Sequence, residues 1–352
     1  MSEIRSRKDA HLDIVLSGEA AATGASHFDR IRFVHEAAPS FALADIDLSV
    51  LFLGHRLRAP LLISAMTGGP ARAGRINEHL AEAAEALGLA MAVGSQRIAI
   101  EAEGDAGVTR SLRQIAPSAM LIANIGAAQV AAWKSPAKVL HAVDMIEADA
   151  LYVHFNPLQE ALQPSGDTDW RGLDAALEDL CRASPVPVLA KEVGAGISAR
   201  TARRLVDLGV QAIDVAGTGG TSWAAVETER HADAIMRETG VPFRDWGIPT
   251  PVAISQVAGA CPGVPIVASG GIRHGLDAAR AIRLGADVVG QAARLLAPAI
   301  EGSGAVVAAL EGTLDQLRIA CFCTGSQSLD DLRRAPLQDF ATAGSNEFND
   351  LR

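Results

Sequence analysis

The stretch VPIVASGGIRHGLDAARAIRLGADVVGQAA, residues 264–293, contains one complete repeating unit of the fold. An apolar run over 264–271 ends in glycines, and an amphipathic helix is expected over 276–284. A second apolar run, over 286–293, ends in a turn of small residues. A strand, a helix and a strand in this order predict two parallel strands joined by a right-handed crossover.

The same unit recurs along most of the chain. Ala- and Leu-rich amphipathic stretches separate most of the apolar runs, and none of the runs has the alternation of a strand that faces solvent on one side. Eight such units close a barrel, so we predict an α/β protein with a single (β/α)8 TIM barrel domain over 1–352. The runs lie at 60–67, 89–97, 119–127, 150–157, 186–194, 211–218, 264–271 and 286–293, and the further helices at 76–87, 137–146, 170–181 and 199–208.

Three segments fall outside this repeat. Residues 1–58 precede the first strand and form an N-terminal extension that we expect to contribute to the substrate site. Residues 217–262 form an oversized connection, which we interpret as a long active-site loop. After Pro298 we expect the last barrel helix and a capping helix, followed by a polar tail over 341–352.

Composition excludes several classes of function. The net charge of −10 argues against a nucleic-acid partner, which needs a basic face. The longest apolar runs are strand-length, far below the roughly 20 residues of a membrane span, and no signal peptide is visible at the N-terminus. The four cysteines lack zinc-ligand spacing and are expected to be reduced thiols of a cytoplasmic protein.

Polar residues gather at the carboxyl ends of the predicted strands, which form the active-site face of such a barrel. Three glycine-rich turns lie there, at 217–222, 269–273 and 290–294. Glycines allow close approach of backbone N–H groups to an anion, and the last two loops are the usual phosphate site of this fold. We therefore predict a phosphorylated cofactor. The polar strand-end residues are Thr67, Ser95, Asn124, His154, Asn156, Lys191 and Thr218.

Lys191 and the residues after the fourth strand carry the most chemistry. A lysine in the barrel mouth can form a Schiff base with a carbonyl substrate or act as a fixed charge beside an anionic flavin. His154 and Asn156 share a strand face, and Gln159 and Glu160 open the next loop. A lone carboxylate among neutral neighbours suits Mg²⁺, although Glu160 also fits a solvated loop acid.

The N-terminal sequence Arg7-Lys8-x-x-His11 is a compact cationic cluster. On a helix these residues share one face, and that face would bind a polyphosphate well. A disordered basic tail is the alternative interpretation of the same spacing.

Taken together, these motifs resemble the flavin-dependent type 2 isopentenyl-diphosphate isomerases over nearly the whole chain. The RK-x-x-H, MTGG, GSQR and N-x-x-QE elements are specific to that family, whereas SGGIR alone indicates only an FMN-linked barrel. The turn at 290–294 departs from the sequence expected of the family. The matching segments are RKDAH at 7–11, SAMTGG at 64–69, VGSQR at 93–97, ANIGA at 123–127, HFNPLQE at 154–160, KEVGAGIS at 191–198, GTGGTSW at 217–223 and SGGIR at 269–273.

The resemblance implies a cofactor, a substrate and a metal. It implies FMN, reduced with NADPH, together with Mg²⁺ and a homo-oligomer such as a tetramer or octamer. The flavin contacts would be Ala65, Met66, Thr67, Ser95, Asn124, Lys191 and Thr221, with Gly271, Arg273, Ala292 and Ala293 at its phosphate. The substrate diphosphate would contact Arg7, Lys8, His11, Ser95, Gln96 and Arg97, while His154, Asn156 and Gln159 would line the substrate and Glu160 would hold Mg²⁺.

The implied reaction, part of isoprenoid biosynthesis, moves a double bond by protonating C4 and removing a proton from C2. A metal-bound Glu160 and a neutral Gln159 are poor acids for an unactivated alkene. We therefore expect the reduced flavin to act as the acid and base with assistance from Gln159, while Lys191 stabilises negative charge on the ring.

Three other functions fit parts of the sequence less well. A 2-hydroxy-acid oxidase on the same barrel needs a His-Gly-Gly-Arg stretch, but GTGGTS follows the sixth strand. An enzyme similar to inosine-monophosphate dehydrogenase needs a nucleophilic cysteine in that loop, and no cysteine occurs before Cys261. A non-catalytic flavin sensor would not explain the N-terminal cations together with Glu160.

Overall fold

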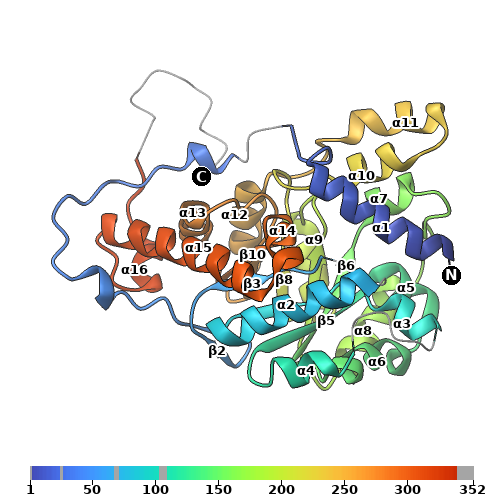
Figure 1. Cartoon of the computed structure of the whole chain (residues 1–352), viewed down its shortest axis with the longest axis horizontal. Coiled ribbons are helices and arrows are strands. Elements are labelled where there is room, and N and C mark those ends of the chain that lie inside the picture. The colour runs from blue at the N-terminus through green and yellow to red at the C-terminus, as the bar shows by residue number, and fades with distance from the viewer. Residues whose placement is uncertain (1, 24–26, 67–70, 103–108, 339–352) are drawn as a thin grey trace.

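The computed structural model describes residues 2–23, 27–66, 71–102 and 109–338, with a closed eight-stranded parallel barrel at its centre (Figure 1). β10 pairs with β3 and closes the barrel, so the predicted (β/α)8 TIM barrel is confirmed. All eight predicted strands are present. They are β3 (Leu61–Ile63), β4 (Ala90–Ala92), β5 (Met120–Gly126), β6 (Ala150–Phe155), β7 (Val188–Glu192), β8 (Ala212–Asp214), β9 (Ile266–Ala268) and β10 (Val288–Gln291).

The barrel strands are apolar on both faces. One set of side chains, including Leu62, Met120 and Ile122, fills the interior, where Phe52 and Leu57 of the β1–β2 hairpin pack against it. The opposite set, including Ile63 and Leu121, packs under the surrounding helices. Burial on both faces explains why the sequence showed uniform apolar runs rather than alternation. The hairpin strands are β1 (Val50–Phe52) and β2 (His55–Leu57).

Helices surround the barrel, and the five predicted helices are all present. The structure adds short helices that open several of the loops, among them the helix that carries Gln159 and Glu160. The predicted helices are α2 (Ala71–Leu87), α6 (Pro136–Ile146), α8 (Leu173–Ala183), α9 (Ala199–Asp207) and α13 (Gly275–Arg283), and the short ones are α3 (Arg97–Ala102), α4 (Ser111–Ile115), α5 (Ala127–Trp133) and α7 (Pro157–Leu162).

Residues 217–262 differ from the long loop that we expected, because most of this segment is helical. It contains α10 (Trp223–Arg230), α11 (Ala234–Gly240), η3 (Val241–Phe243) and α12 (Thr250–Ala260), which is the barrel helix before β9. Local caps start two of these helices: Ser222 Oγ accepts from Ala225 N at 3.1 Å and Asp233 Oδ1 from Ile235 N at 2.8 Å. Gly217, Gly219 and Gly220 precede α10, and Gly247 and Pro249 lie between η3 and α12, so only part of the Gly and Pro content that suggested a loop lies in connections.

The N-terminal extension begins with α1 (Ser2–Ser17), which lies beside α10 at the mouth of the barrel (Figure 1). Ile14 and Val15 pack against Ala20, Ala225 and Val226, so apolar contacts fix α1 against α10. This arrangement brings the N-terminal segment to the end of the barrel where the predicted site residues lie.

The C-terminal segment covers one side of the barrel. The last barrel helix, α14 (Ala293–Glu301), is followed by α15 (Ser303–Cys323), which packs on α2 and α13, and by α16 (Leu329–Arg334). The polar tail predicted over 341–352 lies outside the described residues. None of the described helices is long and apolar enough to cross a membrane.

Candidate active site

A cavity of about 750 Å³ lies at the carboxyl ends of the barrel strands. The strand-end residues Asn124, His154 and Lys191 line it, together with the loops that follow β8, β9 and β10 and with His11 of α1. This is the face of a TIM barrel on which active sites are built, and the volume is that of an ordinary cofactor or substrate site.

Two glycine-rich loops pack so closely at one end of the cavity that side chains are excluded. Gly270 and Gly271 have φ angles of +93° and +72°, which favour glycine. A Cβ on Gly220 would lie 2.7 Å from the backbone nitrogen of Gly271. The loops after β8 and β9 therefore form a backbone-lined wall, which suits the close approach of an anion.

Two buried polar atoms on the cavity wall have no hydrogen-bond partner among the described residues. They are Ser64 Oγ at the end of β3 and Asn156 Oδ1 at the start of α7. Both residues are at least nine-tenths buried. Because buried polar groups in folded proteins are almost always paired, these two atoms indicate that the cavity is built to receive a polar ligand.

Lys191 belongs to a buried polar network at the base of the cavity. Its Nζ lies 3.1 Å from Asp214 Oδ2 and donates to Ser269 Oγ at 3.2 Å, while Ser269 Oγ donates to Asp214 Oδ1 at 2.5 Å. Burial and the adjacent carboxylate of Asp214 raise the pKa of Tyr152 well above its ordinary value. The Asp214 carboxylate beside Lys191 Nζ favours the fixed-charge interpretation of this lysine over Schiff-base formation.

His154 is oriented by a chain of hydrogen bonds that fixes its tautomer. Asn124 Nδ2 donates to the carbonyl of Val93 at 3.0 Å, so Asn124 Oδ1 must accept from His154 Nδ1 at 2.8 Å. The neutral imidazole therefore carries its proton on Nδ1 and leaves Nε2 as an acceptor. Gln96 Oε1 accepts a hydrogen bond from the backbone nitrogen of Asn124 at 2.9 Å and so helps to hold Asn124 in place.

Gln159 is held at both ends of its amide. Its Nε2 donates to Glu227 Oε1 at 2.9 Å, and its Oε1 accepts from Asn156 Nδ2 at 3.0 Å. Glu227 also lies 3.0 Å from His11 Nε2 and 2.5 Å from Arg230. Because these contacts assign donor and acceptor roles, the orientation of the Gln159 amide is fixed.

Glu227 is fully buried, yet its surroundings favour the carboxylate. Burial is the largest single influence and would raise its pKa, but the hydrogen bond and charge of His11 act in the opposite direction. Gln159 and Arg230 add to this effect, so the pKa of Glu227 lies below its ordinary value. The sequence analysis missed this residue because it lies in the segment that we interpreted as a loop. A helix over 223–230 with Trp223 and Glu227 four residues apart was the available signal.

Glu160 is buried and surrounded by N–H donors. Its carboxylate accepts from Asn156 Nδ2 at 2.9 Å and from the backbone nitrogen of Asp167 at 2.7 Å. The Asp167 side chain pairs with Arg97, which also pairs with Glu101 at 3.1 Å. No cluster of three or more His, Cys, Asp or Glu side chains arranged to bind a metal occurs among the described residues, so any divalent cation here would need ligands from the substrate and from water.

The comparisons with known proteins point in one direction. The model of the FMN-dependent dehydrogenase family matches residues 156–339. The chain is 59% identical over 334 residues to the isopentenyl-diphosphate delta-isomerase of Stutzerimonas stutzeri (strain A1501), covering 94% of this chain and 96% of that protein. It is 46% identical to the enzyme of that name from Nostoc sp. (strain PCC 7120), with 95% of each chain covered. The chain belongs to the isopentenyl-diphosphate delta-isomerase family.

Solved structures similar to this isomerase include mandelate oxidase, with a TM-score of 0.64 at 16% identity and coverage of 95% of this chain and 97% of that chain. A lactate oxidase from Pediococcus acidilactici gives 0.65 at 16% identity, with coverage of 92% and 86%. At this identity the likeness shows the barrel fold alone.

Most of the residues that the sequence assigned to the isomerase site lie on the cavity wall. Gln96 does not: it is buried behind the wall, with its amide nitrogen bound to Ala142 O at 2.8 Å, and its assignment as a substrate contact stays a prediction. Thr67 and the side chains of Arg7 and Lys8 lie outside the described residues, although α1 includes residues 7 and 8. The lining residues are His11, Ala65, Met66, Ser95, Arg97, Asn124, His154, Asn156, Gln159, Glu160, Lys191, Thr221, Gly271, Arg273, Ala292 and Ala293.

Proposed function

We propose that this isomerase converts isopentenyl diphosphate to dimethylallyl diphosphate in the cavity at the barrel mouth, with reduced FMN as the acid and base. One observation carries the proposal: a single cavity joins a backbone-lined anion wall to a second polar cluster that contains Gln159, Glu160 and His11. A flavin phosphate suits the first region, and a substrate diphosphate suits the second.

The residues of the wall fit FMN. The glycine loops line the cavity with backbone that a phosphate can approach closely, the orphaned Ser64 hydroxyl can bond the flavin ring, and Lys191 offers a positive charge beside it. We propose that the ring contacts are Ala65, Met66, Thr67, Ser95, Asn124, Lys191 and Thr221 and that Gly271, Ala292 and Ala293 surround the phosphate, with Arg273 behind them.

The diphosphate would bind between α1 and the loop after β4. We propose Arg7, Lys8, His11, Ser95 and Arg97 as its contacts, because cations on one helix face and at the cavity wall give charge-assisted hydrogen bonds to phosphate oxygens. Arg97 is paired with Asp167 and Glu101, so the diphosphate would compete with these carboxylates for the guanidinium.

Mg²⁺ would bind at Glu160. One carboxylate, the free amide oxygen of Asn156, diphosphate oxygens and water form the set of hard oxygen ligands that Mg²⁺ prefers. The cation would also neutralise diphosphate charge next to the buried carboxylate.

The side chains around the proposed substrate pocket would orient the substrate, and neither Gln159 nor Glu227 is a strong acid. Gln159 is a neutral amide, and the pKa of Glu227 lies below its ordinary value, so this carboxyl does not carry a proton at neutral pH. When bound, reduced FMN would supply the acid and base chemistry that the double-bond shift between C4 and C2 needs. Gln159 would hold the substrate carbons against that group, and His154 and Asn156 would close the other side of the pocket. NADPH is the proposed reductant.

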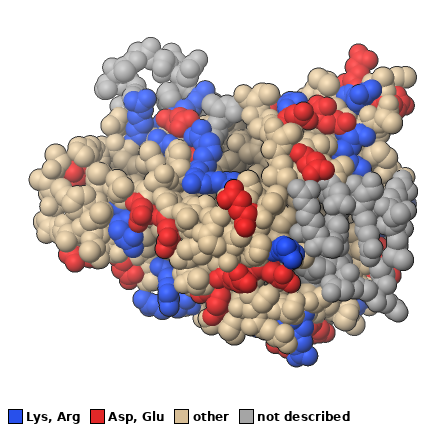
Figure 2. Space-filling model, viewed as in Figure 1, with Lys and Arg blue, Asp and Glu red and all other residues tan. Residues whose placement is uncertain are grey.

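We also expect a homo-oligomer of four or more subunits. The large apolar side chains of Ile235, Val241 and Trp246 on and after α11 are exposed, as a subunit interface would explain. Acidic and basic side chains are interspersed on the described surface seen in Figure 2.

The purified protein tests the proposal directly. It should be yellow when loaded with FMN, and it should convert isopentenyl diphosphate anaerobically in the presence of FMN, NADPH and Mg²⁺. Removal of Mg²⁺ or of the reductant should abolish turnover. Bound FMN without isomerisation, but with oxidation of a 2-hydroxy acid, would overturn the proposal.

A further inference from the structure

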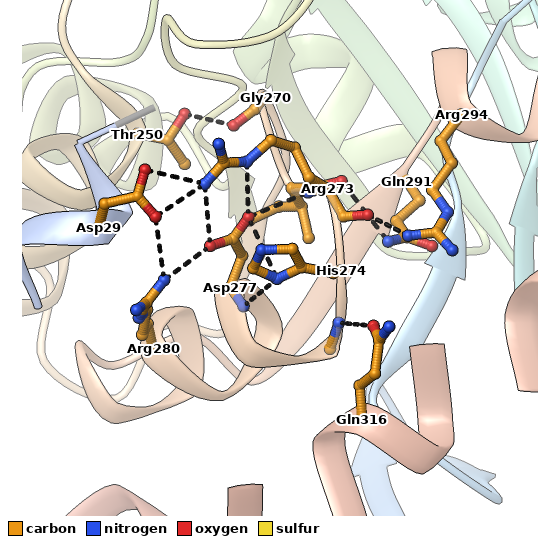
Figure 3. Close-up of polar contacts among 12 residues, drawn as sticks. Asp29, Thr250, Gly270, Arg273, His274, Asp277, Arg280, Gln291, Arg294 and Gln316 are labelled. Atoms are coloured by element: carbon orange, nitrogen blue, oxygen red, sulfur yellow. Dashed lines mark hydrogen bonds and ion pairs between the residues drawn. The ribbon is translucent and has the colours of Figure 1, made fainter. Parts of the chain in front are cut away.

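Arg273, the arginine of the SGGIR loop, has its charge neutralised within the protein (Figure 3). Its Nη2 lies 3.1 Å from Asp29 Oδ1 and its Nε 3.1 Å from Asp277 Oδ2. Arg280 shares the same two carboxylates at 3.4 and 3.1 Å. Two guanidinium groups and two carboxylates give this cluster no net charge, so it offers little attraction to a phosphate dianion.

The same holds for most other cations that line the cavity. Lys191 is paired with Asp214, Arg97 with Asp167 and Glu101, and His11 contacts Glu227. Each of these cations already has a carboxylate partner, so each would share its charge between that partner and a ligand.

Arg294 is different. It is the second residue of α14 and lines the cavity at its exposed rim. Its guanidinium donates to the backbone carbonyl of Arg273, as Figure 3 shows, and no acidic side chain in the described part of the chain pairs with it. This one hydrogen bond holds Arg294 beside the SGGIR loop and leaves its other N–H donors and its charge available.

We propose that Arg294 is the cation that binds the cofactor phosphate, whereas Arg273 with Asp29 and Asp277 braces the loop. The inference rests on the proposed FMN site and refines it. The phosphate would lie between the glycines at 270 and 271, the start of α14 and the Arg294 guanidinium. A guanidinium suits this role because it is planar, always charged and able to donate two parallel hydrogen bonds to a phosphate.

The test compares two ligands that differ only in the phosphate. The full chain, stripped of flavin, is titrated with FMN and with riboflavin, and binding is followed by quenching of flavin fluorescence. Arg294→Ala should weaken FMN binding about 10- to 100-fold and leave riboflavin binding unchanged. Arg294→Lys should retain part of the FMN affinity, because lysine keeps the positive charge but lacks the paired N–H donors of the guanidinium.

Arg273→Ala and Asp29→Asn are the matched comparisons. Both should change FMN and riboflavin affinity by the same factor, because they loosen the loop without removing a phosphate contact. Arg200→Ala on α9, outside the cavity, should change neither. The inference is wrong if Arg294→Ala leaves the ratio of FMN to riboflavin affinity unchanged, or if Arg273→Ala lowers that ratio as much.

Two further outcomes separate this inference from the proposed function. If the unaltered chain binds neither flavin, the proposed FMN site fails. If Arg294→Ala weakens binding of isopentenyl diphosphate and leaves the FMN to riboflavin ratio unchanged, Arg294 belongs to the substrate diphosphate and the inference is overturned.

Discussion

The Lys191 ammonium lies 3.1 Å from the Asp214 carboxylate, and both side chains are buried at the base of the cavity. Taking two charges out of water is costly, and removal of one partner leaves the other uncompensated. A buried pair at this position therefore fits a functional role more readily than a purely stabilising one.

Asp214→Asn should lower the free energy of unfolding by about 3 to 5 kcal/mol, because the ammonium then lacks a countercharge. The double variant Lys191→Met with Asp214→Asn should recover part of this loss, since neither buried charge remains. Urea unfolding of Asp214→Asn, of Lys191→Met and of the double variant measures the coupling free energy between the two side chains. Equal stability of Asp214→Asn and the unaltered chain would contradict the prediction.

Glu192 gives a pH dependence of known sign. Burial raises its pKa to about 7 from an ordinary 4.5, although four backbone N–H groups between residues 193 and 196 donate to it. Between pH 4.5 and 7 the folded state then binds more protons than the unfolded state, so the free energy of unfolding falls as pH rises. The expected fall is about 3 kcal/mol, complete above pH 7.

Glu192→Gln tests this assignment, because the amide oxygen still accepts N–H groups but does not titrate. Unfolding by urea at several pH values should show that the difference in stability between the unaltered chain and this variant decreases from pH 4.5 to 7. A constant difference would mean that the four N–H donors outweigh burial.

Gln159→Ala should lower kcat by roughly 10²- to 10⁴-fold, the range found for assisted proton transfer, while FMN affinity stays constant. Glu227→Gln should lower kcat about tenfold or more, because the amide of Gln159 loses the carboxylate that fixes its orientation. Gln114→Ala, on α4 outside the cavity, is the control. Steady-state assays measure kcat for the three variants. Full turnover in Gln159→Ala would remove this residue from the mechanism.

Gly220→Ala should weaken FMN binding about 10- to 100-fold, because the new Cβ would lie 2.7 Å from Gly271 N and push the two phosphate loops apart. Gly259→Ala is the matched control. This glycine lies in α12, and a Cβ at its position would meet open space. The Gly259→Ala variant should therefore bind FMN with unchanged affinity, and its helix should be more stable by up to about 1 kcal/mol. Fluorescence titration and thermal unfolding measure both effects.

The barrel could be predicted from the amino-acid sequence alone. Each strand is a short apolar run and each predicted helix has a clear amphipathic period, so local patterns alone specify eight repeating units. The same patterns locate the end that carries the site, because residues such as Asn124, His154 and Lys191 lie near the carboxyl ends of their strands, and parallel strands bring these ends together.

The pairing of these side chains becomes visible only in the folded protein. Glu227 joins Gln159 from 68 residues away, Asp214 joins Lys191 from a neighbouring strand, and Asp29 crosses 244 residues to Arg273. Such partners leave no local periodicity, because a carboxylate looks the same in sequence whether it faces solvent or a buried cation. Its role depends on burial and on the charge beside it, and both arise only when the barrel closes and α1 and α10 pack across its mouth.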